Sequence, residues 1–86
     1  MTDSYRLGLD ILTRIGAGLD ARHNRVAEVA PDFARLAIGF GYGEIFARPG
    51  LPLKDRALAA VAAQAALGTS AAQLRAHVAA ALHLGW

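Results

Sequence analysis

One stretch in the middle of the chain decides the fold: residues 31–49, which read PDFARLAIGFGYGEIFARP. Pro31 suits the first position of a helix because its missing N–H would have no intrahelical partner there, and Asp32 favours the helix dipole. Apolar side chains then recur at helical spacing, in a stripe that Glu44 continues: Phe33, Leu36, Ala37 and Phe40. We predict one α-helix over residues 31–47.

Helical patterns also cover the rest of the chain, and no run alternates as a half-buried strand would. Gly68 suits the position after a helix end, and Ser70 with Gln73 forms a capping box for the last helix. We therefore predict an all-α fold, a single domain over residues 1–86 built from four to five helices. Their expected bounds are residues 4–16, 25–30, 31–47, 52–68 and 71–84, with a polar connection at 19–24. The first helix should bury Leu7, Ile11, Leu12 and Ile15.

The composition favours an oligomer. A domain of this length buries only about two thirds of its unfolded surface, yet 55% of the residues are hydrophobic and only 19% are charged. Between Ala57 and Leu67 the only polar side chain is Gln64. A helix that is apolar on every side needs protein on every side. We expect neighbouring copies of the chain to supply it, as a homo-oligomer.

Charge and residue types argue against several classes of function. The formal net charge is +2, with basic residues spread singly from Arg6 to Arg75, so we predict no nucleic-acid partner. The chain has no cysteine, which excludes disulfides and thiolate catalysis. Its histidines lack a second ligand at metal spacing, so we expect no metal. Without a signal-peptide pattern or a membrane-spanning apolar run, we expect a cytoplasmic protein with no membrane partner.

The glycines of residues 39–43, GFGYG, invite comparison with a phosphate-binding loop. Such a loop follows a strand and ends in Lys followed by Ser or Thr, and neither feature is present here. We expect these glycines instead to let their helix approach another one closely.

Glu44 is the strongest candidate for chemistry, because it continues an apolar stripe on which an unpaired carboxylate would be costly to bury. Arg48 follows four residues later and would share its face if the helix persisted, which permits an ion pair. The pair has two interpretations. It closes the helix end before Pro49, or it is an active-site carboxylate beside an anion-binding guanidinium.

His77 is the second candidate, on the apolar flank of the last helix between Leu74 and Val78. A histidine there is either a packed core or interface residue or a proton donor near neutral pH. His83 fits a favourable partner for the helix dipole. Three further polar residues fit a pocket as well as they fit capping, packing or interface roles: Tyr42, Arg56 and Gln64.

The residues around Glu44 and Arg48 resemble a known family. Residues 42–51, YGEIFARPGL, are similar to the YGEIW-x-RPGL signature of carboxymuconolactone decarboxylases. The similarity extends through Tyr5-Arg6-x-Gly8 before the motif and Leu74-x-x-His77-x-x-x-Ala81-Leu82-x-x-Gly85 after it, and so covers most of the chain. The related alkylhydroperoxidases use a glutamate and two cysteines ahead of the histidine. Counted back from His77, those places hold Leu58, Ser70 and Gln73, so the resemblance implies no peroxidase activity.

The resemblance implies an all-α, alkylhydroperoxidase D-like fold that assembles into trimers or hexamers. It also implies a lyase of aromatic-compound degradation, in the β-ketoadipate pathway, that decarboxylates a small carboxylated lactone without a cofactor. The catalytic residues would then be three. Arg48 would bind a carboxylate or the lactone carbonyl and stabilise an enolate. His77 would donate the proton, and Glu44 would either orient His77 or act as the acid itself.

Two departures from the family pattern stand out. Phe46 occupies the place of a tryptophan, and the family continues past Gly85 into a further helix, so we expect the C-terminus at Trp86 to be truncated. The rival hypothesis is a non-catalytic helical oligomerisation module of the same fold. A third is another cofactor-free lyase or isomerase on the same scaffold.

Overall fold

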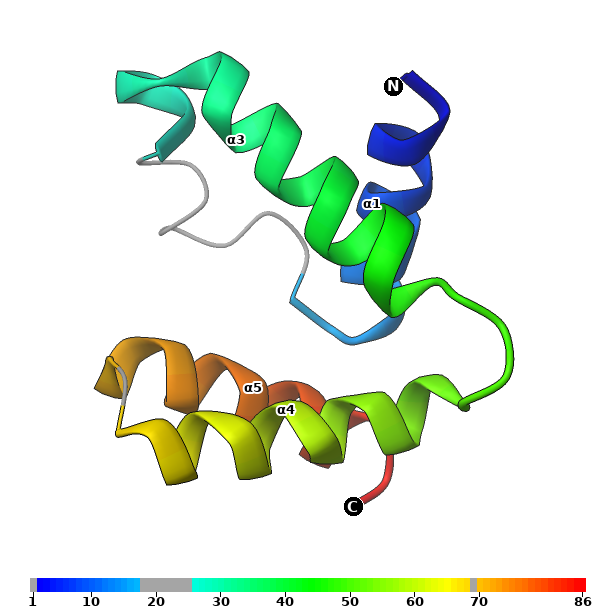
Figure 1. The fold of residues 1–86 in the computed structure, drawn as a ribbon, viewed down its shortest axis with the longest axis vertical. Helices are drawn as coiled ribbons and strands as arrows, with labels where there is room; N and C mark the ends of the chain where they lie inside the picture. The colour runs from blue at the N-terminus through cyan, green and yellow to red at the C-terminus, as the bar shows by residue number, and fades with distance from the viewer. Residues whose placement is uncertain (1, 18–25, 69) are drawn as a thin grey trace. The chain divides into compact units, whose positions relative to one another are not determined.

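The computed structural model describes residues 2–17, 26–68 and 70–86, and every regular element among them is a helix (Figure 1). The elements are α1 (Thr2–Arg14), α3 (Pro31–Ala37), η1 (Ile38–Phe46), α4 (Leu53–Leu67) and α5 (Ala71–His83). A short helical turn at residues 26–29 precedes α3. The predicted all-α fold is thus confirmed. The polar connection expected at residues 19–24 lies outside the described residues.

The chain forms two compact units, Met1–Arg48 and Pro49–Trp86. The first contains α1, α3 and η1, and the second contains α4 and α5. The expectation of a single domain stays a prediction.

Local sequence signals set the helix ends as predicted. Pro31 occupies the first turn of α3. Gly68 ends α4 in the left-handed conformation, with φ of 66°, and its N–H donates to the Gln64 carbonyl over 3.2 Å. The Ser70 side chain accepts a hydrogen bond of 3.4 Å from the Gln73 N–H at the start of α5. Each signal joins residues at most four apart, so it needs no tertiary context.

Residues 38–46 differ from the predicted α-helix. They continue α3 without a break but form a π-helix, η1, with the wider i→i+5 turn. The face that turns inward also differs from the prediction. Ala34, Ile38, Gly39 and Gly43 are buried, whereas three members of the expected apolar stripe are largely exposed: Phe33 (62%), Leu36 (51%) and Phe40 (62%).

Close contact between α1 and η1 explains which face is buried. A Cβ atom added to Gly43 would overlap the Ser4 carbonyl oxygen and lie 2.8 Å from the Ser4 carbonyl carbon. One added to Gly8 would overlap the Ile38 carbonyl oxygen and lie 2.9 Å from Ile38 Cγ2. The prediction that the glycines of residues 39–43 permit close helix approach is confirmed for Gly39 and Gly43, whereas a Cβ added to Gly41 would have nothing within 4 Å. Small residues face inward because larger ones would hold the two backbones apart.

The core of α1 follows the predicted face with one exception. Ile11, Leu12 and Ile15 are buried as expected. Leu7 is 45% exposed, and its neighbour Gly8 takes the inward position.

In the second unit, α4 and α5 run antiparallel side by side (Figure 1). Their buried residues are alanines, Ala57, Ala80 and Ala81. The end of the unit returns to the start of α4, where the Trp86 indole N–H donates to the Lys54 carbonyl over 2.7 Å. Lys54 Nζ lies 4.5 Å from the centroid of the same indole ring, so two interactions join Trp86 to Lys54.

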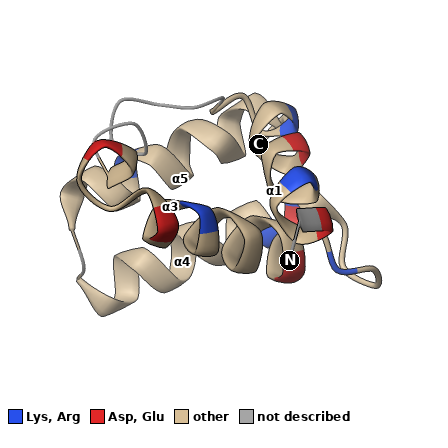
Figure 2. Ribbon diagram, turned by 90° about the horizontal axis from the view of Figure 1, so that it is seen from above, with Lys and Arg blue, Asp and Glu red and all other residues tan. Residues whose placement is uncertain are grey.

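Much of α4 is exposed. Leu58 is 43% exposed and Leu67 is 76% exposed. The described residues of a single chain therefore do not bury this apolar helix on every side. Figure 2 shows few charged residues along α4 and α5, and after Arg56 the sequence contains only Arg75 among Lys, Arg, Asp and Glu. No helix in the described part of the chain combines the length and apolarity needed to cross a bilayer.

Candidate functional site

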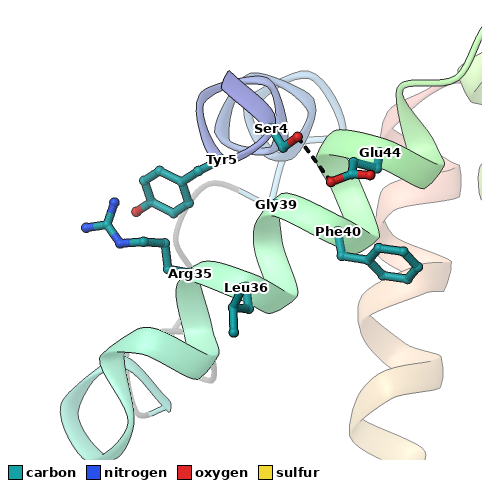
Figure 3. A pocket seen from close by; sticks show the side chains of 7 residues that line it. All are labelled: Ser4, Tyr5, Arg35, Leu36, Gly39, Phe40 and Glu44. Atoms are coloured by element: carbon teal, nitrogen blue, oxygen red, sulfur yellow. Dashed lines mark hydrogen bonds between the residues drawn. The ribbon is translucent and has the colours of Figure 1, made fainter. Parts of the chain in front are cut away.

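A pocket of about 250 Å³ opens in the first unit, between the start of α1 and the segment formed by α3 and η1 (Figure 3). On η1 it includes Glu44, the strongest candidate from the sequence. Its lining residues are Ser4, Tyr5, Arg35, Leu36, Gly39, Phe40 and Glu44. Because Leu36, Phe40 and Glu44 follow at intervals of four residues, the exposed apolar stripe forms one wall of this pocket.

One end of the pocket holds a carboxylate and a hydroxyl. Ser4 Oγ donates a hydrogen bond of 3.2 Å to Glu44 Oε2. This contact depends on the neighbouring Gly43, whose lack of a side chain lets the η1 backbone reach that of Ser4. Glu44 is exposed, so the burial cost expected for a carboxylate on an apolar stripe does not arise.

The other end holds a cation that the sequence analysis missed. Arg35 Cζ lies 4.5 Å from the centroid of the Tyr5 ring, a cation–π contact that joins α3 to α1. In the sequence, Arg35 looks like an ordinary solvated helix residue. The one sequence feature that could have identified Arg35 is its position next to Leu36, which belongs to the same stripe as Glu44.

Apolar groups separate the two ends. Figure 3 shows Arg35 and Tyr5 on one side and Ser4 and Glu44 on the other, with Gly39 between them and the Leu36 and Phe40 side chains along the same helical segment. A Cβ on Gly39 would lie 3.5 Å from the Tyr5 backbone nitrogen, so here too α1 and η1 are in close contact. A guanidinium, an apolar wall and a hydrogen-bond acceptor suit a small ligand with an anionic group and a hydrogen-bond donor.

Arg48 lies outside this pocket. The π-helix ends at Phe46, and Arg48 is an exposed residue beyond the cap at Ala47. The expectation that Arg48 shares a face with Glu44 required a helix that continues, and that condition is not met. Its role toward a ligand stays a prediction.

His77 belongs to the second unit. It is half-buried on α5, three and four residues before the buried Ala80 and Ala81, and so on the face of α5 that packs inward. The convergence of Glu44, Arg48 and His77 in one site stays a prediction. In the described part of the chain, no three His, Asp or Glu side chains gather as a metal site would require.

Two other polar candidates have structural contacts. Arg56 donates from Nε to the Leu51 carbonyl over 3.2 Å and from Nη2 to the Pro49 carbonyl over 3.3 Å. It therefore fastens the loop of the RPGL motif to the first turns of α4. The Tyr42 and Phe46 rings meet edge to face, with centroids 5.3 Å apart and planes at 80°. For these two residues, packing and capping roles account for the observed contacts.

Comparisons with known proteins agree with this arrangement of motifs. The carboxymuconolactone decarboxylase family matches residues 31–86, from α3 to the end of the second unit. A 4-carboxymuconolactone decarboxylase of Acinetobacter baylyi is 35% identical over an alignment of 86 positions, covering 94% of this chain and 61% of the relative. The chain thus spans less than two thirds of that relative's length. No solved structure matches the chain.

Proposed function

Because the chain belongs to the carboxymuconolactone decarboxylase family, we propose that it is a carboxy-lyase that removes carbon dioxide from a small carboxylated lactone without a cofactor. The structural observation that supports this proposal is the pocket that places Glu44 and Arg35 around one apolar wall. The relative whose name supplies the substrate class is longer than this chain, so the activity of this chain is itself part of the proposal.

The reaction requires an electron sink and a proton. When the bond to the carboxylate carbon breaks, carbon dioxide leaves and the bonding electrons move into the conjugated lactone carbonyl, which becomes an enolate. A proton delivered to carbon then gives the enol-lactone. The net change consumes one proton and releases one carbon dioxide, so no redox cofactor is required.

In the proposal, three residues stabilise the enolate and deliver the proton. Arg48 binds a carboxylate or the lactone carbonyl and stabilises the enolate charge. His77 donates the proton, and Glu44 either orients the His77 side chain or acts as the acid itself. Glu44 belongs to the first unit and His77 to the second, so the role of each residue is tested by its own substitution.

A turnover assay tests the proposal. The protein is incubated at high concentration with carboxymuconolactone, and the ultraviolet absorbance of the lactone is followed. Glu44→Gln and His77→Gln should each lower kcat by about 100-fold or more, the usual share of general acid–base catalysis. Glu28→Gln and His83→Gln are matched controls, since both side chains are exposed and lie outside the pocket. Unchanged turnover in His77→Gln would remove His77 from the mechanism.

The second candidate function is a non-catalytic oligomerisation module. The observation in its favour is the number of large apolar side chains left exposed: Phe33, Phe40, Leu67, Leu82 and others. Contiguous exposed apolar patches mark association surfaces, and Phe33 and Phe40 belong to one exposed stripe of the segment formed by α3 and η1. A protein that assembles by light scattering but leaves the lactone absorbance unchanged would favour the module over the enzyme.

A further inference from the structure

We propose that Arg35 is the residue of this pocket that recognises the ligand's carboxylate, and that the carboxylate it binds is one the reaction retains. The ligand class is then a small lactone that carries a second carboxylate besides the one it loses, with the retained carboxylate at Arg35. The inference rests on the proposed function for the nature of the reaction, and it adds the residue that selects the acid.

The charges of the pocket support this assignment. Among the described residues that line it, Arg35 is the only cation and Glu44 the only anion. A guanidinium presents a planar fork of N–H donors that matches both oxygens of a carboxylate. An anionic ligand group is therefore attracted to the Arg35 end and repelled from the Glu44 end, which fixes the direction in which the ligand binds.

The Tyr5 ring orients the guanidinium before a ligand arrives. Arg35 Cζ is 4.5 Å from the ring centroid, and Tyr5 is half-buried on α1. A side chain already held in one place loses less conformational entropy on binding than a free one. Tyr5 is thus a positioning residue for Arg35.

The spacing of the two polar ends sets the length of the ligand. Arg35 and Glu44 are nine residues apart on a continuous helical segment, on the order of 10 Å along the axis. The pocket residues that come between them in the sequence are apolar, namely Leu36, Gly39 and Phe40. A ligand that reaches both ends must therefore carry an apolar middle, such as a lactone ring.

The chemistry decides which carboxylate Arg35 binds. A guanidinium paired with the carboxylate that departs would stabilise a charge present in the ground state and lost in the transition state. Such a contact raises the barrier, because only interactions stronger in the transition state accelerate a reaction. A contact with a carboxylate that stays charged throughout carries no such penalty.

Equilibrium binding of an unreactive probe tests the inference. The probe is the saturated γ-butyrolactone monocarboxylate, and its primary amide is the neutral match. Calorimetric titration of the full chain should give at least about tenfold tighter binding of the acid than of the amide, as expected for one charge-assisted hydrogen-bonded contact. Arg35→Gln should abolish this preference and leave amide binding unchanged. Arg35→Lys should retain part of it, and the exposed Arg75→Gln of the second unit should retain all of it.

Tyr5 provides a second test. Tyr5→Leu should reduce the acid-over-amide ratio, and Tyr5→Phe, which keeps the ring, should restore it. Because the ratio compares two ligands on the same protein, a loss of folded protein lowers both affinities and leaves the ratio unaffected.

Two outcomes would overturn the inference: an acid-over-amide ratio that survives Arg35→Gln, or a wild-type protein without the preference. Parallel turnover measurements separate its failure from that of the proposed function. If the wild type decarboxylates the lactone while Arg35→Gln keeps the preference, the role of Arg35 alone is wrong. If the preference depends on Arg35 but no carbon dioxide is released, the decarboxylase proposal is wrong and the binding role of Arg35 holds.

Discussion

Gly43 of η1 lies directly against the Ser4 carbonyl of α1, with no room between them for a methyl group. The Ser4 side chain in turn donates to Glu44, the residue that follows Gly43. The same backbone contact that packs the two helices therefore also builds the acidic end of the pocket.

The first prediction concerns this contact. Gly43→Ala should lower the free energy of unfolding by about 1–3 kcal/mol, because an extra methyl in a filled space forces the helices apart. Gly41→Ala is the matched control: it lies in the same π-helix, has nothing within 4 Å of its added Cβ, and should be neutral or stabilising by up to about 1 kcal/mol. Urea unfolding followed by circular dichroism measures both. Equal effects of the two substitutions would contradict the packing argument.

The second prediction concerns the hydrogen bond between Ser4 and Glu44. Ser4→Ala should change the free energy of unfolding by less than about 1 kcal/mol, because the bond lies at an exposed carboxylate. In an active protein it should still lower kcat severalfold, since Glu44 loses the donor that holds it. Ser4→Thr keeps the hydroxyl and should recover most of the rate. A kcat unchanged by Ser4→Ala would show that this bond does not orient Glu44.

The third prediction concerns the pair of contacts between Trp86 and Lys54. Trp86→Phe keeps a ring beneath the lysine but removes the N–H, and should lower the stability of the second unit by about 0.5–1.5 kcal/mol. Lys54→Met keeps the backbone acceptor but removes the cation, and should cost about 0.5–1 kcal/mol. Arg75→Met, an exposed cation on α5, serves as control.

Thermal unfolding by circular dichroism would measure these three variants. Trp86 is the single tryptophan of the chain, so its fluorescence in the Lys54→Met and Arg75→Met variants reports unfolding of the second unit alone. Identical unfolding midpoints for Lys54→Met and Arg75→Met would mean that the Lys54 cation does not contribute to the stability of the second unit.

The fourth prediction concerns assembly. We expect the wild-type chain to form a homo-oligomer, a trimer or hexamer, that covers exposed apolar residues such as Phe33. Phe33→Ser should reduce the assembled mass without changing helicity, whereas Asp32→Ser, at the exposed neighbouring position, should not. Light scattering coupled to gel filtration measures the mass. A wild type that is monomeric at tens of micromolar would refute the expectation.

The sequence predicted the elements of this protein well because their ends depend on near neighbours. Pro31 begins α3, Gly68 ends α4, and Ser70 caps α5 through the N–H of Gln73. The family followed from the motif around Glu44, which is likewise contiguous. Each of these signals joins residues only a few positions apart, and residues that close in the sequence are also close in space.

The inward face of the central helix could not be predicted in the same way. Hydrophobicity favoured Phe33 and Phe40, whereas the structure buries Gly39 and Gly43. The spacing of hydrophobic residues indicates how apolar a helix face is. It does not indicate how closely the backbone of a second helix approaches that face. The approach depends on the shape of both helices at once.

What the sequence alone determined, then, is the all-α fold, the residues at which α3, α4 and α5 begin or end, and the family to which the chain belongs. Only the tertiary structure decided that Arg35, rather than Arg48, shares a pocket with Glu44, because Ser4 and Tyr5 reach that pocket through contacts some 30 to 40 residues distant along the chain. Side chains so far apart meet only where two backbones can touch, and the absence of side chains at Gly8 and Gly43 provides that place.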